Sequence, residues 1–256
     1  MAISHLLLDI EGTTCPVSFV AEVLFPYARE RLADYLSEQA SDPELAALVQ
    51  AVAQAWQADS HGEVQALRAA LPSGALEAAA RGDGLPQDAA TLVLPYLRWL
   101  IANDVKLTAL KDLQGRIWRA GYASGELVAP LFADVPSALR HWQHQGLALA
   151  VYSSGSVPAQ QLLYSHTQEG DLRPLFQHWF DTRIGAKHDA TSYRSIAAAM
   201  GCPAPQVLFI SDALAELEAA DQAGMACLFS DREGNPARDP GHFERIVDYG
   251  TLRFPR

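Results

Sequence analysis

Short apolar runs alternate with segments of helical periodicity over much of the chain. Five runs are too short for helices and suit buried strands, at residues 3–9, 147–152, 178–181 (a weak one), 206–210 and 225–229. Between and beside them, apolar residues recur at helical spacing over 134–146, 158–167, 190–200 and 213–223, the last ending at Gly224. The repeated strand–helix order predicts an α/β fold with a parallel sheet.

The pattern differs between the first and second strands. Residues 19–39 have a mostly helical period, and residues 40–125 are rich in Ala, Leu, Gln and Trp, with no convincing strand. Gly62, 72–74, 82–84 and Pro86 divide this region into helices. We therefore predict a Rossmann-like parallel-sheet core, residues 1–18 and 126–256, with an all-helical cap, residues 19–125, inserted after the first strand.

Composition narrows the class of protein. The 256 residues carry 19 Lys+Arg against 30 Asp+Glu, a formal charge of -11, with 49% hydrophobic residues. These values predict a soluble globular protein and argue against nucleic acid or an anionic membrane as a partner. The N-terminus has no basic segment typical of a signal peptide, and no apolar run is long enough to span a membrane. Three scattered cysteines favour a reducing cytoplasm.

Polar residues follow the predicted strands. Ligands in open parallel sheets bind outside the carboxyl ends of the strands, where Asp9, Glu11, Ser153 and Asp212 would gather. Asp9 and Glu11 suit a covalent mechanism in which one carboxylate attacks and the other transfers protons. Taken alone, this pair is more often a turn-capping Asp and a surface Glu.

Two further segments suit a phosphate ligand. Ser153, Ser154 and Gly155 offer hydroxyl and backbone N–H groups to an oxyanion, although a Ser-capped turn explains them equally well. Lys187 is one of only three lysines and could neutralise a phosphate together with a nucleophilic carboxylate. A solvated loop lysine is the ordinary alternative.

The last strand end offers a candidate metal ligand. Asp212 could bind Mg²⁺ with Asp9, and Glu216, one helical turn later, could hold a metal-bound water. The alternative is that Asp212 caps the next helix and Glu216 interacts favourably with the helix dipole.

The order Asp-x-Glu, Ser, Lys and Asp resembles the haloacid dehalogenase superfamily, most of whose members are Mg²⁺-dependent phosphatases. Longer segments resemble the enolase-phosphatases of methionine salvage, also called acireductone synthases. Glu11 is the sharpest sign, because most superfamily phosphatases have Asp at that position. The similar segments are DIEGTT at 9–14, VYSSGSVPAQQLL at 151–163, residues 185–193, FISD at 209–212 and, in the helical insertion, residues 104–115 and 118–126.

The resemblance implies a role for each candidate residue. Asp9 would form an aspartyl-phosphate, and Glu11 would protonate the leaving oxygen and then activate water. Ser153, Ser154 and Gly155 would bind the phosphoryl group, whose charge Lys187 would neutralise. One Mg²⁺ per chain would be held by Asp9, Glu11 (through its backbone carbonyl) and Asp212, with Glu216 near it.

The resemblance also implies a substrate. Such an enzyme enolises 2,3-diketo-5-methylthiopentyl 1-phosphate before removing its phosphate, and Mg²⁺ or Lys187 could stabilise the enolate. We expect a cytoplasmic monomer without nucleic acid or membrane partners. Candidate cap contacts to this substrate are Lys106, Tyr96, Trp99 and Trp118, although core packing explains the three aromatic residues better.

Three alternatives stay open at this point. A capped Mg²⁺-dependent phosphatase of the same superfamily could act instead on a small sugar phosphate. A dehalogenase would use the same Asp nucleophile without a metal, but Glu11 and Asp212 argue against it. A non-catalytic binding protein is disfavoured by the intact set of Asp9, Lys187 and Asp212.

Overall fold

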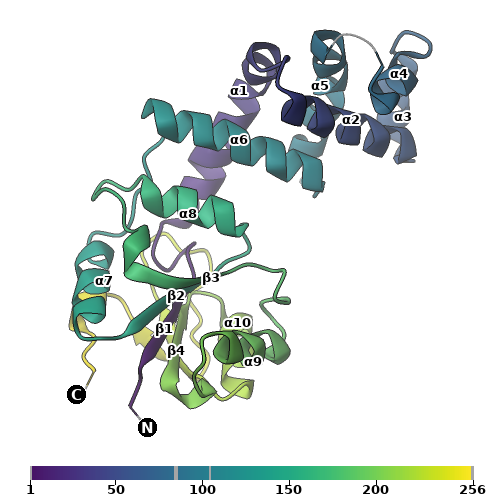
Figure 1. The fold of residues 1–256 in the computed structure, drawn as a ribbon. Helices are drawn as coiled ribbons and strands as arrows, with labels where there is room; N and C mark the ends of the chain where they lie inside the picture. The colour runs from purple at the N-terminus through teal and green to yellow at the C-terminus, as the bar shows by residue number, and fades with distance from the viewer. Residues whose placement is uncertain (1, 84–85, 104, 255–256) are drawn as a thin grey trace. The chain divides into compact units, whose positions relative to one another are not determined.

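The chain folds into two compact units, residues 1–23 with 125–256, and residues 24–124 (Figure 1). The structure is a computed structural model that describes residues 2–83, 86–103 and 105–254. Two positions used above lie outside the described residues: Gly84, in a predicted break between helices, and Asp104, in a segment that resembles the enolase-phosphatases.

The first unit is built on a six-stranded parallel sheet with the order β3-β2-β1-β4-β5-β6. The α/β fold with a parallel sheet is thereby confirmed, and the five predicted strands match to within a few residues. The short sixth strand was not predicted, because it has three residues of which two are exposed. The strands are β1 His5–Leu8, β2 Ala148–Tyr152, β3 Phe176–Phe180, β4 Val207–Ser211, β5 Ala226–Ser230 and β6 Glu244–Ile246.

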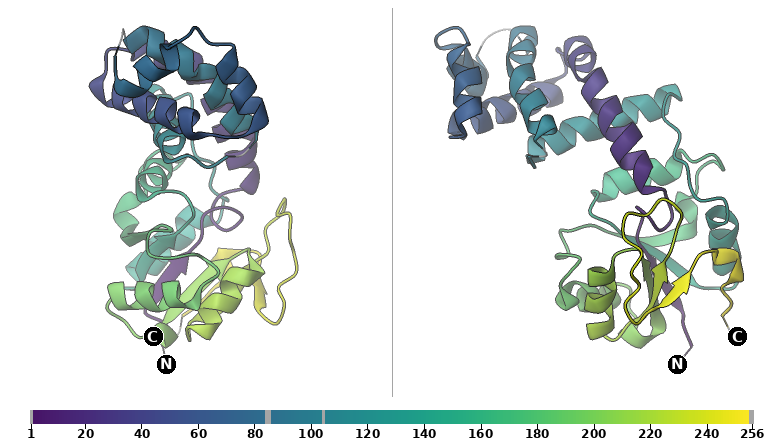
Figure 2. Two further views of the ribbon diagram at one scale, coloured as in Figure 1. Left: turned by 90° about the vertical axis from the view of Figure 1, so that its right-hand side faces the viewer. Right: turned by 180° about the vertical axis from the view of Figure 1, so that it is seen from behind.

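Helices cover both faces of this sheet. In Figures 1 and 2, α9 and α10 lie on one side of the sheet and α7 lies on the other. Tyr193 and Ile196 of α9 and Leu217 of α10 belong to one buried cluster with Leu7 and Phe209 of the sheet. The helices of this unit are α7 Val135–His144, α8 Val157–Ser165, α9 Ala190–Ala199 and α10 Leu214–Gln222, with short 3-10 turns at Arg173–Leu175, Ala204–Gln206 and Tyr249–Thr251.

The second unit is helical, and its chain lies between β1 and β2. A π-helix at Phe19–Leu24, all but the last residue of which belongs to the first unit, runs directly into α1, where the sequence predicted one continuous helix. Pro26 lacks the N–H that a regular α-helix would bond to the carbonyl of Glu22. The helices are α1 Phe25–Glu38, α2 Pro43–Ala58, α3 Gly62–Ala69, α4 Ala75–Arg81, α5 Pro86–Ala102 and α6 Thr108–Ser124.

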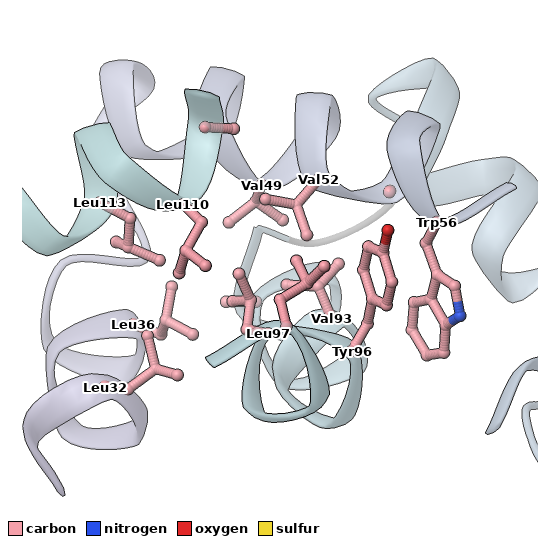
Figure 3. Packing of buried hydrophobic residues seen from close by; sticks show 14 of the residues in the cluster. Leu32, Leu36, Val49, Val52, Trp56, Val93, Tyr96, Leu97, Leu110 and Leu113 are labelled. Carbon is pink, nitrogen blue, oxygen red and sulfur yellow. The ribbon is translucent and has the colours of Figure 1, made fainter. Parts of the chain in front are cut away.

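A single apolar cluster holds the helical unit together, as Figure 3 shows. Each helix contributes residues three or four positions apart, which places them on one face. Trp56 and Tyr96 stack with their ring centroids 5.3 Å apart. The residues labelled in the figure are Leu32, Leu36, Val49, Val52, Trp56, Val93, Tyr96, Leu97, Leu110 and Leu113. Among the described residues, no helix combines the length and apolar character needed to span a bilayer.

A buried arginine anchors the C-terminal segment of the first unit. Arg232 is 5% exposed and forms two hydrogen bonds to the Asp134 carboxylate, at 3.1 and 2.9 Å. Its guanidinium also lies 4.1 Å from the Tyr249 ring centroid and 4.8 Å from that of Phe132. The bidentate geometry and the two rings compensate for removing this charge from water.

We therefore predict that Arg232→Ala lowers the free energy of unfolding by about 3 kcal/mol, because it leaves the Asp134 carboxylate without its cation. Urea denaturation of the full chain measures this change. The matched control is Arg173→Ala, which removes an exposed pair with Asp171 and should change stability little. Equal effects of the two substitutions would contradict the prediction.

Candidate active site

The candidate site lies at the carboxyl edge of the sheet. Leu8, the last residue of β1, pairs with Val151 of β2 and Ile210 of β4, so the three strands end at the same level. Asp9 follows β1 directly and is 5% exposed. The edge therefore brings Asp9 close to residues more than 140 positions away in the chain.

A buried ion-pair cluster connects three of the candidate residues. The Lys187 ammonium lies 2.7 Å from Asp9 Oδ1 and 2.7 Å from Glu216 Oε2. Lys187 is 8% exposed, so it is not a solvated loop lysine. The Ser211 hydroxyl donates to Glu216 Oε2 at 3.0 Å. Glu216 therefore contacts Lys187 and Ser211.

Three hydroxyl groups fix the loop that carries Lys187. Tyr193 donates to the carbonyl of Lys187 at 2.7 Å, Ser192 donates to that of Ala186 at 2.8 Å, and Tyr152 donates to that of Gly185 at 2.9 Å. Ser192 and Tyr193 belong to α9, and Tyr152 belongs to β2. Lys187 is thus directed at Asp9 by an ordered backbone, which its sequence context alone does not reveal.

Negative charge is in excess at this edge. Burial, followed by repulsion from the Asp9 carboxylate, raises the pKa of Asp212 to about 7 and also raises the pKa values of Glu11 and Glu216. Burial alone would lower the pKa of Lys187, but Asp9 and Glu216 outweigh it and raise that pKa. One ammonium therefore faces four carboxyl groups, which favours a second cation.

The oxygen atoms available here fit a hard divalent cation. Mg²⁺ usually binds through one or two carboxylates and keeps several waters. Asp9 and Asp212 would offer two carboxylates, and Glu11, two residues after Asp9, would offer its backbone carbonyl. Among the described residues, no three His, Cys, Asp or Glu side chains form a complete ligand group. A site made of two carboxylates and one backbone carbonyl would not need three such side chains.

A cavity of about 480 Å³ opens beside Lys187. Ser154 and Glu216 are among its lining residues, together with Thr182 and His188, which the sequence analysis did not select. The exposed His188 lacks a motif of its own and follows Lys187 in the same loop. The complete lining is Ser154, Thr182, Ala186, Lys187, His188, Ala213, Ala215 and Glu216.

The serine turn after β2 has a defined geometry. Ser153 is buried, and its hydroxyl accepts a hydrogen bond from the Gly155 N–H at 3.2 Å. Ser156 caps α8 by accepting from the Ala159 N–H at 3.4 Å. The capping role therefore belongs to Ser156, which leaves the exposed Ser154 side chain to line the cavity.

Known proteins resemble this chain over most of its length. The family of haloacid dehalogenase-like hydrolases matches residues 3–224. An enolase-phosphatase E1 of Synechococcus sp. strain RCC307 is 51% identical over 231 residues, which cover 90% of this chain and 86% of the relative. That of Synechococcus elongatus is 47% identical over 252 residues and covers 98% of both chains.

The chain belongs to the enolase-phosphatase family of haloacid dehalogenase-like hydrolases. The crystal structure of the UTR4 protein from Saccharomyces cerevisiae agrees with this fold, with a TM-score of 0.71 and 32% sequence identity. It covers 98% of this chain and 100% of the yeast chain. The family assignment made from the sequence motifs is thereby confirmed.

In this chain, the three candidate aromatic residues of the helical unit have partners within that unit. The Tyr96 hydroxyl donates to Asp59 at 2.9 Å and the Trp99 indole to Glu63 at 2.8 Å. The Trp118 indole donates to the backbone carbonyl of Leu24 at 2.8 Å. These contacts favour a packing role for all three. Lys106 is exposed and stays a candidate substrate contact.

The loop that follows β1, residues 9–15, carries the candidate nucleophile Asp9 (the nucleophile loop), and its backbone conformation requires a glycine at position 12. Gly12 has a φ of +68°, and a Cβ at this position would lie 2.1 Å from Asp212 Oδ2. We predict that Gly12→Ala displaces Asp212 and lowers kcat for hydrolysis by about a hundredfold, because small misplacements of catalytic groups are costly.

Gly115→Ala in α6 is the control for this substitution, since a Cβ there would meet no atom within 4 Å. It should keep full activity and stabilise the helix by up to about 1 kcal/mol. Circular dichroism would establish that both variants fold. Normal turnover by a folded Gly12→Ala enzyme would contradict the steric argument.

Proposed function

We propose that this protein is a bifunctional, Mg²⁺-dependent enolase-phosphatase (acireductone synthase) of methionine salvage. It converts 2,3-diketo-5-methylthiopentyl 1-phosphate to its enol and then removes the phosphate to give the acireductone. The observation that carries the proposal is the near full-length similarity to enolase-phosphatases. The buried cluster of Lys187, Asp9 and Glu216 supports it, because it provides a positioned nucleophile and a charge to stabilise phosphate.

The contacts of Asp9 suggest which oxygen attacks phosphorus. Oδ1 accepts from the Ile10 N–H at 2.8 Å and faces Lys187 at 2.7 Å. Oδ2 has only the Ser211 hydroxyl at 3.5 Å among the described residues, so its lone pairs are available. Oδ2 would attack, the phosphorus–oxygen ester bond would break, and the aspartyl-phosphate would form. Lys187 would hold Asp9 in this orientation.

Glu11 would transfer the protons of both phosphatase steps. Burial and the neighbouring Asp9 carboxylate raise its pKa, which favours the protonated acid that a leaving alkoxide needs. After giving up this proton, the Glu11 carboxylate would accept one from the water that hydrolyses the aspartyl-phosphate. The aspartyl-phosphate bond would then break, so that phosphate leaves, the Asp9 carboxylate is restored and Glu11 is protonated again.

The phosphoryl group would bind between Lys187 and the serine turn. Ser153, Ser154 and the Gly155 backbone come from the loop after β2, and Ser154 and Lys187 line the same cavity. A charged ammonium with hydroxyl and N–H donors suits a phosphate dianion. During enolisation, Lys187 would also stabilise negative charge on the substrate's carbonyl oxygen.

Asp9, Asp212 and the Glu11 carbonyl would hold one Mg²⁺ per chain. When bound, the ion would offset the negative charge of the phosphoryl oxygens. Glu216, expected near the metal from sequence, contacts Lys187 and Ser211, and we assign to it the positioning of Lys187. We further propose a cytoplasmic monomer, and the free Cys15, Cys202 and Cys227 suit a reducing compartment.

The decisive experiment compares substrates with the purified enzyme. We expect enol formation and phosphate release from the diketone phosphate, monitored by absorbance and by a phosphate assay, with far slower turnover of a panel of sugar phosphates. Complete chelation of divalent cations should abolish phosphate release, and added Mg²⁺ should restore it. Efficient turnover of a sugar phosphate, with none of the diketone, would instead support the alternative of a sugar phosphatase.

The nucleophile is tested by Asp9→Asn, which keeps the size of the side chain but removes the attacking carboxylate. Phosphate release should fall below detection, because no aspartyl-phosphate can form. Trapping of a phosphorylated wild-type chain, and its absence in the variant, checks the covalent step directly. Wild-type turnover by Asp9→Asn would rule out this role.

A further inference from the structure

Asn235, in the loop after β5, contacts the nucleophile loop through its side-chain amide. Asn235 is 7% exposed, and its Nδ2 donates to the carbonyls of Gly12, at 2.9 Å, and Ser230, at 3.3 Å. These two bonds fix the orientation of the amide. Turning it over would place Oδ1 against two carbonyl oxygens with no hydrogen between them.

The other end of this amide is unsatisfied. Asn235 Oδ1 is buried and has no hydrogen-bond partner among the described residues. Leaving a buried acceptor unpaired costs about 1–3 kcal/mol. Buried polar atoms of this kind are usually paired, with protein or with ordered water. The direction of Oδ1 therefore points to a donor that is not part of the polypeptide.

Oδ1 faces the candidate metal site. A Cβ built on Gly12 would lie 3.0 Å from Asn235 Oδ1 and 2.1 Å from Asp212 Oδ2. The amide oxygen and the carboxylate oxygen thus border the same small space beside the Gly12 backbone. An amide oxygen and an ionised carboxylate are both acceptors and do not bond to each other, but a water molecule can donate to either.

We propose that Asn235 is an outer-sphere residue of the divalent-cation site, whose Oδ1 accepts a hydrogen bond from a water bound to the cation held by Asp9 and Asp212. Mg²⁺ keeps several waters in protein sites, and these waters need acceptors. The inference rests on the Mg²⁺ site of the proposed function. It adds a residue from outside the strand-end motifs, on the turn that follows β5.

The competing explanation is that Asn235 only ties down the nucleophile loop through Nδ2. Ser230→Ala is the matched control, because the Ser230 hydroxyl also donates to the Gly12 carbonyl, at 3.1 Å, and has no part in the proposed water contact. If Asn235 only stabilises this loop, Asn235→Ala and Ser230→Ala should lose similar amounts of Mg²⁺ affinity. The proposed role predicts a loss in Asn235→Ala alone.

The test is calorimetric titration of Mg²⁺ alone into the full-length protein without substrate. Asn235→Ala should raise the Kd for Mg²⁺ by about tenfold or more, while Ser230→Ala should stay close to wild type. Asn235→Asp keeps an acceptor but loses the Nδ2 donors, so it should bind Mg²⁺ at least as tightly as wild type. Circular dichroism would check that each variant folds. If Asn235→Ala does not fold, the Mg²⁺ affinity of Asn235→Asp tests the proposal.

Unchanged Mg²⁺ affinity in Asn235→Ala would overturn the proposal, as would equal losses in Asn235→Ala and Ser230→Ala or weakened binding by Asn235→Asp. Failure of the wild-type protein to bind Mg²⁺ would instead overturn the metal site itself. The two failures are therefore distinguishable in the same set of titrations.

Discussion

The buried ammonium of Lys187, held between Asp9 and Glu216, is the interaction on which the site depends. Removing a lysine charge from water is costly, and only close carboxylates with good geometry compensate for it. The same ammonium partly offsets the repulsion among the carboxyl groups that lie together at this edge of the sheet. The hydroxyls of Tyr152, Ser192 and Tyr193 are arranged to keep this cation in place.

The sheet topology explains how such distant residues meet. β1 lies between β2 and β4, so Asp9 at its end has the serine turn after β2 on one side and Asp212 after β4 on the other. The helical unit is inserted after β1 and has its own apolar core, so the strands can pair without it. The C-terminal segment then closes around the nucleophile loop, where the Tyr249 hydroxyl donates to the Thr13 carbonyl at 3.0 Å.

The sequence was sufficient for the features that depend on local pattern. Apolar runs such as 206–210 predicted strands, and parallel pairing then predicted that Asp9, Ser153 and Asp212 share an edge. Contacts between side chains that are far apart in the sequence could not be predicted from local pattern. Asn235 meets Gly12 across 223 positions, and no spacing in the chain encodes that contact. The contact of Glu216 with Lys187 similarly depends on how α10 meets the loop before α9.

The formal charge of -11 gives a misleading impression of which ligands this chain can bind. Net charge governs long-range attraction, whereas a small anion responds to the few charges and dipoles within contact distance. Part of the acidic excess lies at Asp9, Glu11, Asp212 and Glu216, where burial makes uncompensated charge costly. In the proposed site, a divalent cation would reverse the local sign, and Lys187 with the serine turn would add to the attraction for phosphate. Under the proposed function, the excess of carboxylates would make the edge depend on a cation, and the bound cation would let the edge bind phosphate.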